Sequence, residues 1–122
     1  ELMGAVTSIV YNNTREELII QGWLCEKGLV GSIKYRLDIF RPELGSRASL
    51  SAKTAQSPSS NTVKNQCEAN GRFNFQHVLS RADLDKYQIK PGSHIRMYSY
   101  ANKEGMPNKM IGKDQNYFVP NY

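Results

Sequence analysis

The sequence predicts an all-β fold, and three observations lead to this prediction. Apolar residues come in short groups rich in Val, Ile, Tyr and Phe, turn residues such as Asn, Gly and Pro separate these groups, and helical periodicity is almost missing. At 122 residues the chain has the length of a single domain. About six to eight short antiparallel strands of this kind predict an immunoglobulin-like β-sandwich, with an OB-type barrel of similar size as the alternative.

Composition and alternation predict the first three strands. Residues 5–11 are rich in β-branched side chains and end at the turn signal Asn12-Asn13, and residues 17–25 form a second apolar run. The clearest pattern is SIKYRLDIF, residues 32–40, in which apolar side chains occupy every second position from Ile33 to Ile39. This period of two predicts a strand with one face in the core and one face in water.

The second half of the chain begins with a segment that is poor in large apolar residues. From Glu43 to Gln66 the composition predicts a surface loop with one short strand at residues 47–52. A strand at residues 72–79 follows, with Phe73 and Phe75 on its inner side, and Ser80 begins a helical turn. A further strand is expected at residues 94–101, and residues 109–111 and 117–119 are expected to form one or two closing strands.

Gly22 lies inside the second strand, directly before the only tryptophan. Strict alternation would place Leu18 and Ile20 on one side and Trp23 and Cys25 on the other. A glycine within a strand commonly marks a bulge, and a bulge at Gly22 would bring all four side chains onto one face. We therefore expect Trp23 to be a structural core residue beside Cys25, between the two sheets. The functional alternative is an exposed Trp23 that stacks on a sugar.

Two cysteines, Cys25 and Cys67, lie far apart in the sequence. Neither has a histidine at a zinc-ligand spacing, so a disulfide is the better interpretation. Such a bond closes a long loop and contributes about 3–4 kcal/mol on the chain-entropy model. It would indicate an oxidising compartment, outside the cell or in a periplasm. The alternative is a pair of buried free thiols in a cytosolic protein.

Five short segments together resemble a β-sandwich module of bacterial secreted and surface proteins. They are GWLCEK, SIKYRLDIF, CEANGRFNF, PGSHIRMYSYA and NYFVP. Modules of this type have no settled function and accompany enzymes, sugar-binding modules and other repeats. The resemblance implies that Trp23 is structural and that Cys25 pairs with Cys67. The chain departs from the pattern at Glu26, where Asp is usual, and at Asn70, where His is usual.

No residue pattern predicts an enzyme, a cofactor or a metal. Ser80, His77 and Asp83 fall close together, but no Gly-x-Ser-x-Gly turn presents the serine. Asp83 and Asp85 resemble the polar side of a helical turn more than a catalytic pair. No glycine-rich loop is followed by Lys-Ser or Lys-Thr, and no apolar run is long enough to cross a membrane.

The best functional signal is a basic and aromatic surface. The net charge of +5 favours acidic partners, although the basic residues are scattered. In a sandwich the strands at residues 32–40 and 94–101 are often neighbours, and their wet sides would then meet. The candidate ligand-binding residues are Lys34, Arg36, Phe40, His94, Arg96, Tyr98 and Tyr100. Such a surface suits sugar rings with an anionic group, or stacked bases, although Tyr and Arg are also ordinary residues on an exposed sheet.

We therefore expect a single sandwich domain spanning residues 1–122, either a processed product or one module of a longer protein. The leading hypothesis is a non-catalytic binding or accessory module of a secreted or periplasmic bacterial protein, directed to carbohydrate or the cell envelope. One alternative is a protein-binding module, such as an inhibitor, immunity protein, adhesin or assembly subunit, with its contacts in the loops at residues 43–66 or 102–108. A single-stranded nucleic-acid-binding barrel is the less favoured alternative.

Overall fold

Two antiparallel sheets make up the protein in a computed structural model, which describes residues 2–100, 109–111 and 117–122. The first sheet has the order β1-β2-β6 and contains β1 (Leu2–Asn12), β2 (Glu17–Glu26) and β6 (Asn74–Ser80). The second has the path β4-β3-β7-β8 and contains β3 (Lys34–Arg41), β4 (Ser46–Ser49), β7 (His94–Ser99) and β8 (Met110–Ile111). The short strands β5 (Lys53–Thr54) and β9 (Tyr117–Phe118) pair with β3 and β7.

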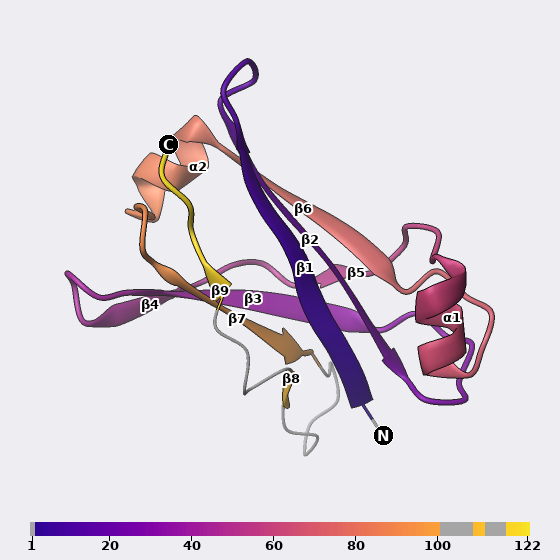
Figure 1. Ribbon diagram of the computed structural model, residues 1–122. Coiled ribbons are helices and arrows are strands. Elements are labelled where there is room, and N and C mark those ends of the chain that lie inside the picture. Colours follow the sequence, from indigo (N-terminus) through magenta and orange to yellow (C-terminus); the bar gives the residue numbers. More distant parts are fainter. Residues whose placement is uncertain (1, 101–108, 112–116) are drawn as a thin grey trace.

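This arrangement confirms the predicted all-β sandwich, in which the two sheets cross one another in layers (Figure 1). Within the described residues no strand of one sheet pairs with a strand of the other, which distinguishes the fold from a closed barrel. Strands β5, β8 and β9 have only two residues each, so the longer strands provide most of the sandwich.

The main core lies between the sheets and follows the period of two. Every second residue of β3 and β7 is buried, and these residues pack on the inner side chains of β2. The fully buried members of this set are Leu18, Ile20, Leu24, Tyr35, Leu37, Ile39, Ile95 and Met97. Each such apolar side chain contributes about 1.5–3 kcal/mol on burial.

Strand β2 contains no bulge at Gly22, so the expected rearrangement of its side chains is wrong. Its pairing with β6 runs without interruption through Gly22, which lies opposite Phe75. The irregularity is in β1 instead, where the register skips Thr7. Gly22 is required because a Cβ there would lie 2.5 Å from the carbonyl oxygen of Ala5 and 2.7 Å from the Phe75 ring.

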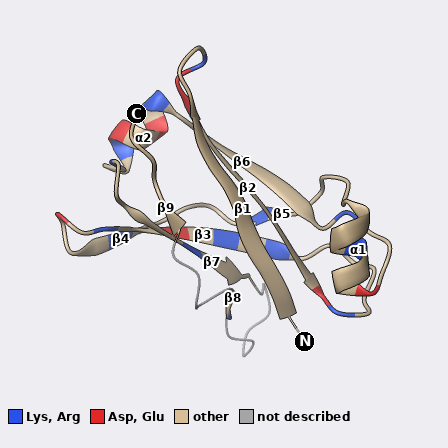
Figure 2. Ribbon diagram, viewed as in Figure 1, with Lys and Arg blue, Asp and Glu red and all other residues tan. Residues whose placement is uncertain are grey.

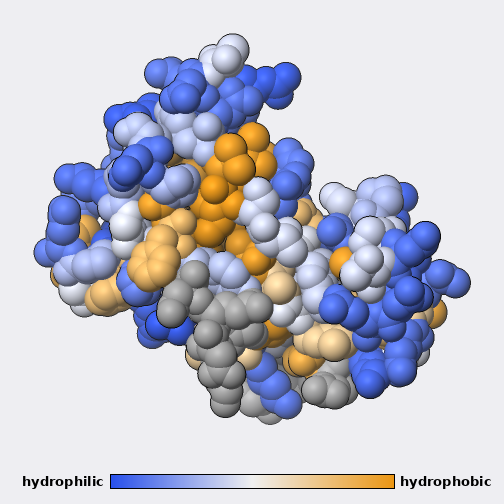
Figure 3. All heavy atoms as spheres, in the orientation of Figure 1, coloured by the Kyte–Doolittle hydropathy of each residue, from blue (hydrophilic) through white to orange (hydrophobic). Residues whose placement is uncertain are grey.

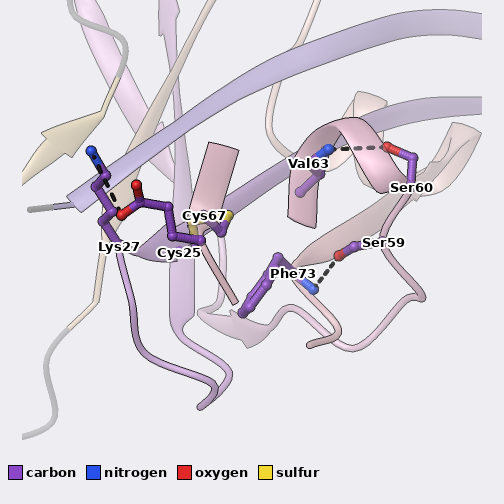
Figure 4. Close-up of a disulfide and its surroundings, with 8 residues drawn as sticks. Cys25, Lys27, Ser59, Ser60, Val63, Cys67 and Phe73 are labelled. Atoms are coloured by element: carbon purple, nitrogen blue, oxygen red, sulfur yellow. Dashed lines mark hydrogen bonds and ion pairs between the residues drawn. A yellow bond between two sulfur atoms is a disulfide. The ribbon is translucent and has the colours of Figure 1, made fainter. Parts of the chain in front are cut away.

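Because β2 keeps strict alternation, Trp23 and Cys25 face away from the main core. A short helix, α1 (Asn61–Cys67), covers them, in a segment that the sequence predicts to be a loop. Ser60 begins this helix by accepting a hydrogen bond from the Val63 amide. Cys67, at the end of α1, forms a disulfide with Cys25 (Figure 4).

The disulfide is confirmed, but it fastens a helix to the outer face of the first sheet and does not join the two sheets. Trp23 is only 8% exposed and belongs to a second apolar cluster on this outer face. The cluster consists of Trp23, Cys25, Val63, Cys67 and Phe73. Phe73 is held in place because its amide donates to the Ser59 hydroxyl oxygen at 2.7 Å (Figure 4).

The predicted helical turn at Ser80 is present as α2 (Arg81–Lys86). The Ser80 hydroxyl accepts from the Asp83 amide, and the Asp83 carboxylate accepts from the Ser80 amide. This hydrogen bond from the Ser80 backbone is the main cause that lowers the pKa of Asp83. The helix therefore begins at a capping box, which depends only on Ser80 and on Asp83 three residues later in the sequence.

Candidate ligand-binding face

The outward side of β3 and β7 brings the predicted candidate residues together. The two strands pair antiparallel, with Arg36 opposite Tyr98 and Phe40 opposite His94. The alignment of the two chain segments continues past Arg36 to Lys34 and Tyr100, since the Tyr100 amide donates a hydrogen bond to the Lys34 carbonyl oxygen at 2.9 Å. In the ribbon, β3 contains both basic and acidic positions (Figure 2).

We call this surface the β3–β7 face. It consists of the predicted residues together with Asp38 of β3 and further side chains from the same face of the neighbouring strands β4, β8 and β9. Its members are Lys34, Arg36, Asp38, Phe40, Arg47, His94, Arg96, Tyr98, Tyr100, Met110 and Phe118.

Arg36 is the rigid part of the β3–β7 face. Its Nε lies 2.9 Å from Asp38 Oδ1, and its Nη2 lies 3.0 Å from Asp38 Oδ2. The guanidinium carbon also lies 5.1 Å from the centre of the Tyr98 ring. Asp38 is only 3% exposed, so this fork of hydrogen bonds compensates a buried carboxylate. Arg36 is therefore a positioning residue more than a free cation.

Tyr98 links β7 to β4 across the outer side of β3. Its hydroxyl oxygen accepts a hydrogen bond of 3.2 Å from Nη1 of Arg47, which lies on β4. Strand β3 is the neighbour of both β7 and β4, so the Tyr98 and Arg47 side chains together bridge it. Arg47 is not among the predicted residues of this face, although the alternation of polar Arg47 and Ser49 with apolar Ala48 and Leu50 indicates an outward-facing side chain.

Arg96 uses little of its hydrogen-bonding capacity on the described residues. It lies opposite Asp38 in the register, yet within the described part of the chain it forms no ion pair within 4.0 Å. Its one described side-chain contact is a weak donation of 3.8 Å from Nη1 to the Met110 sulfur. A guanidinium in this state can bind a carboxylate, sulfate or phosphate through two parallel hydrogen bonds.

An aromatic group lies next to these cations. The His94 ring makes edge-to-face contacts with Phe40 at 6.3 Å and with Phe118 at 4.3 Å between ring centres. Phe118 is 47% exposed, so its ring is accessible to a ligand. The β3–β7 face thus combines partly exposed rings with guanidinium groups, which is the combination that binds an acidic sugar or a nucleotide.

The three residues that fall close together in the sequence, His77, Ser80 and Asp83, each form hydrogen bonds that serve the fold. His77 is 3% exposed, and its Nδ1 lies 3.1 Å from the Tyr35 hydroxyl inside the core. Burial, with a smaller effect of Lys53, lowers the pKa of His77 to about 4. Ser80 and Asp83 cap α2, as described above, and no hydrogen bond among the described residues joins them to His77.

Of the two loops that the sequence predicts as protein-binding segments, the structure describes only the first, at residues 43–66. The second loop, residues 102–108, lies entirely outside the described residues. The segment at residues 43–66 is more ordered than predicted, because it contains β4, β5 and most of α1. Near its start, a hollow of about 260 Å³ lies between the turn at residues 41–44 and the segment at residues 88–93.

No protein-family model, curated protein or solved structure matches the chain. In the described residues, no helix is long and apolar enough to cross a membrane. No group of three or more His, Cys, Asp or Glu side chains gathers at a possible metal site in that same part of the chain. The disulfide is typical of proteins that mature in an oxidising environment.

Proposed function

We propose that the protein is a non-catalytic binding module that recognises an acidic carbohydrate of the cell envelope through the β3–β7 face. The observation behind this proposal is the position of Arg96, a guanidinium that forms no ion pair with the described residues and lies on the same strand as His94 of the partly exposed aromatic group. The disulfide, and the resemblance to modules of bacterial secreted and surface proteins, favour a secreted or periplasmic location.

The division of roles on the β3–β7 face supports an anionic ligand. Arg36 already compensates Asp38, so binding a ligand acid would require it to give up a buried partner. Arg96 and Arg47 do not have this constraint, and each can turn toward a ligand group. We therefore expect Arg96 and Arg47 to bind the acidic groups while the ring of Phe118 stacks on a sugar.

The direct test is calorimetric titration with polygalacturonate, a carboxylated polysaccharide, and with neutral dextran. Wild-type protein should bind the first and not the second. The Arg96→Gln variant should bind about tenfold to a hundredfold more weakly, since a hydrogen bond to a charged group contributes about 1.5–3 kcal/mol.

Arg15→Gln is the matched control. Arg15 is exposed in the turn between β1 and β2, on the other sheet, and its removal lowers the net charge by the same amount. This variant should bind within about twofold of wild type, because only the charge on the β3–β7 face matters. Equal weakening in both variants would show a non-specific effect of net charge, and binding to neither polysaccharide would refute the proposal.

A titration with single-stranded poly(dT) separates the nucleic-acid alternative. A nucleic-acid ligand would bind more tightly than polygalacturonate at low salt and lose affinity steeply as salt rises. That result would replace carbohydrate with nucleic acid as the ligand of the same face.

A further inference from the structure

Strand β1 forms an edge of the first sheet. It pairs with β2 along ten positions, and on its other side no strand is paired among the described residues. Its eleven residues, LMGAVTSIVYN, include no charged residue and no proline. Proteins usually protect an exposed edge with Lys, Pro or a covering segment, because free backbone groups invite another strand. In Figure 2 the whole of β1 is free of basic and acidic positions.

Two features protect the first half of β1. The register irregularity at Thr7 disrupts the ladder, and the Val6 amide donates to the Tyr117 hydroxyl at 3.0 Å. The second half, residues 8–12, has neither feature. On its inner face, Ile9 and Tyr11 pack partly against the main core, and the Tyr11 ring stacks on Tyr122 with 4.7 Å between ring centres. Val10, on the outer face, is exposed.

The second half of β1 is also apolar on its outer face. Val10 is 53% exposed, and in the register it continues a row with Ile19 of β2 and Val78 of β6, which are both partly exposed. Apolar atoms gather over the upper half of β1 in the space-filling view (Figure 3). An uncharged strand with an apolar row beside it has the properties of a strand-pairing surface.

We propose that residues 8–12 pair antiparallel with the same segment of a second copy, around a two-fold axis at Val10. Such a register places Val10 opposite Val10 of the partner subunit, Ile9 opposite Tyr11 of the partner subunit, and Ser8 opposite Asn12 of the partner subunit. The two residues of each pair match in polarity, and like charges do not meet because β1 contains no charged residue. The two three-stranded sheets then form one continuous sheet with an isologous interface.

A second copy suits this edge for two physical reasons. The segment is its own complement, because β-branched Val10 meets itself and the flanking residues match in pairs. The chain has a net charge of +5, and an uncharged strand is the surface through which two such copies approach with least repulsion. The β3–β7 face belongs to the other sheet, so pairing leaves both of those faces open.

The dimer should be weak and reversible. A single pair of short strands buries less than the roughly 1,200 Å² of a stable interface, so we expect a dissociation constant between about 1 μM and about 1 mM. Sedimentation equilibrium over this concentration range should therefore show a monomer–dimer equilibrium. A protein that stays monomeric throughout the range would overturn the proposal.

The decisive variants change Val10. Val10→Lys places an ammonium group next to the same group of the partner subunit, so it should weaken the dimer at least about tenfold. Val10→Thr keeps the β-branched shape without charge and should stay within a few fold of wild type. A circular dichroism spectrum like that of wild type checks the fold of each variant. A dimer that Val10→Lys leaves intact, or that both variants weaken equally, would place the contact elsewhere.

Discussion

Removal of the Cys25–Cys67 disulfide should destabilise the protein by about 4 kcal/mol. The two cysteines are 42 residues apart, and closing a loop of that length lowers the entropy of the unfolded chain by a corresponding amount on the chain-entropy model. We propose the double variant Cys25→Ala/Cys67→Ala, compared with oxidised wild type. For a small domain this loss is a large fraction of the total free energy of unfolding.

The position of the disulfide adds a local consequence. It fastens α1 over Trp23, in an apolar cluster separate from the main core. In the double variant α1 should detach more readily than the two sheets separate, because the main core keeps its own contacts. Trp23 should then become more exposed, and its fluorescence emission should shift to longer wavelength before the sheets unfold.

Urea denaturation followed by Trp23 fluorescence and by circular dichroism measures both effects. The m-value should rise in the double variant, because an unfolded chain without the cross-link exposes more surface. Reduced wild-type protein is the control and should behave like the variant. A loss of less than about 1 kcal/mol would refute the loop-entropy argument, and an unchanged Trp23 emission would refute the idea that the disulfide holds α1 in place.

Two further predictions concern buried positions. Because the pKa of His77 is about 4 in the folded protein and about 6.5 when unfolded, the unfolded state takes up the proton first, and stability should fall by about 3 kcal/mol as pH drops from 6.5 to 4. A His77→Gln variant should lose this part of the pH dependence in urea titrations, and an identical slope in both proteins would contradict the assignment. Gly22→Ala should destabilise by about 1–3 kcal/mol, since the added Cβ meets the Ala5 carbonyl oxygen and the Phe75 ring. Gly31→Ala, where a Cβ meets no atom within 4 Å, is the control in thermal denaturation, and equal losses would contradict the steric argument.

Alternation predicted the β3–β7 face well, because period two is a local property of a strand. Ile33 to Ile39 alternate with polar residues, and the inner members from Tyr35 onward are buried. The burial of Asp38 could not be predicted in the same way. Asp38 is held by the guanidinium of Arg36, which in turn lies against the ring of Tyr98, and Tyr98 comes from a strand far away in the sequence.

Alternation in β2 was not sufficient to predict which face of the strand lies in the main core, because both of its faces are apolar. Leu18 and Ile20 on one side and Trp23 and Cys25 on the other each read as core residues. The sequence could specify that the two pairs lie on opposite faces, but only packing could decide that the second face is covered by α1 and not by a sheet. A bulge at Gly22 would be needed only if both pairs lay in one core. In the structure Gly22 is needed because a side chain there would clash with the ring of Phe75.

The sequence by itself determined the strands with one polar face, the helix cap at Ser80 and the cysteine pair, because these depend on spacing, local hydrogen bonds and the number of thiols. The tertiary structure alone decided what covers each apolar face, which arginine is bound to a buried acid, and which strand forms the edge of the first sheet among the described residues. Those features depend on contacts between residues distant in the chain, and the local pattern of a strand is the same whichever neighbour it meets.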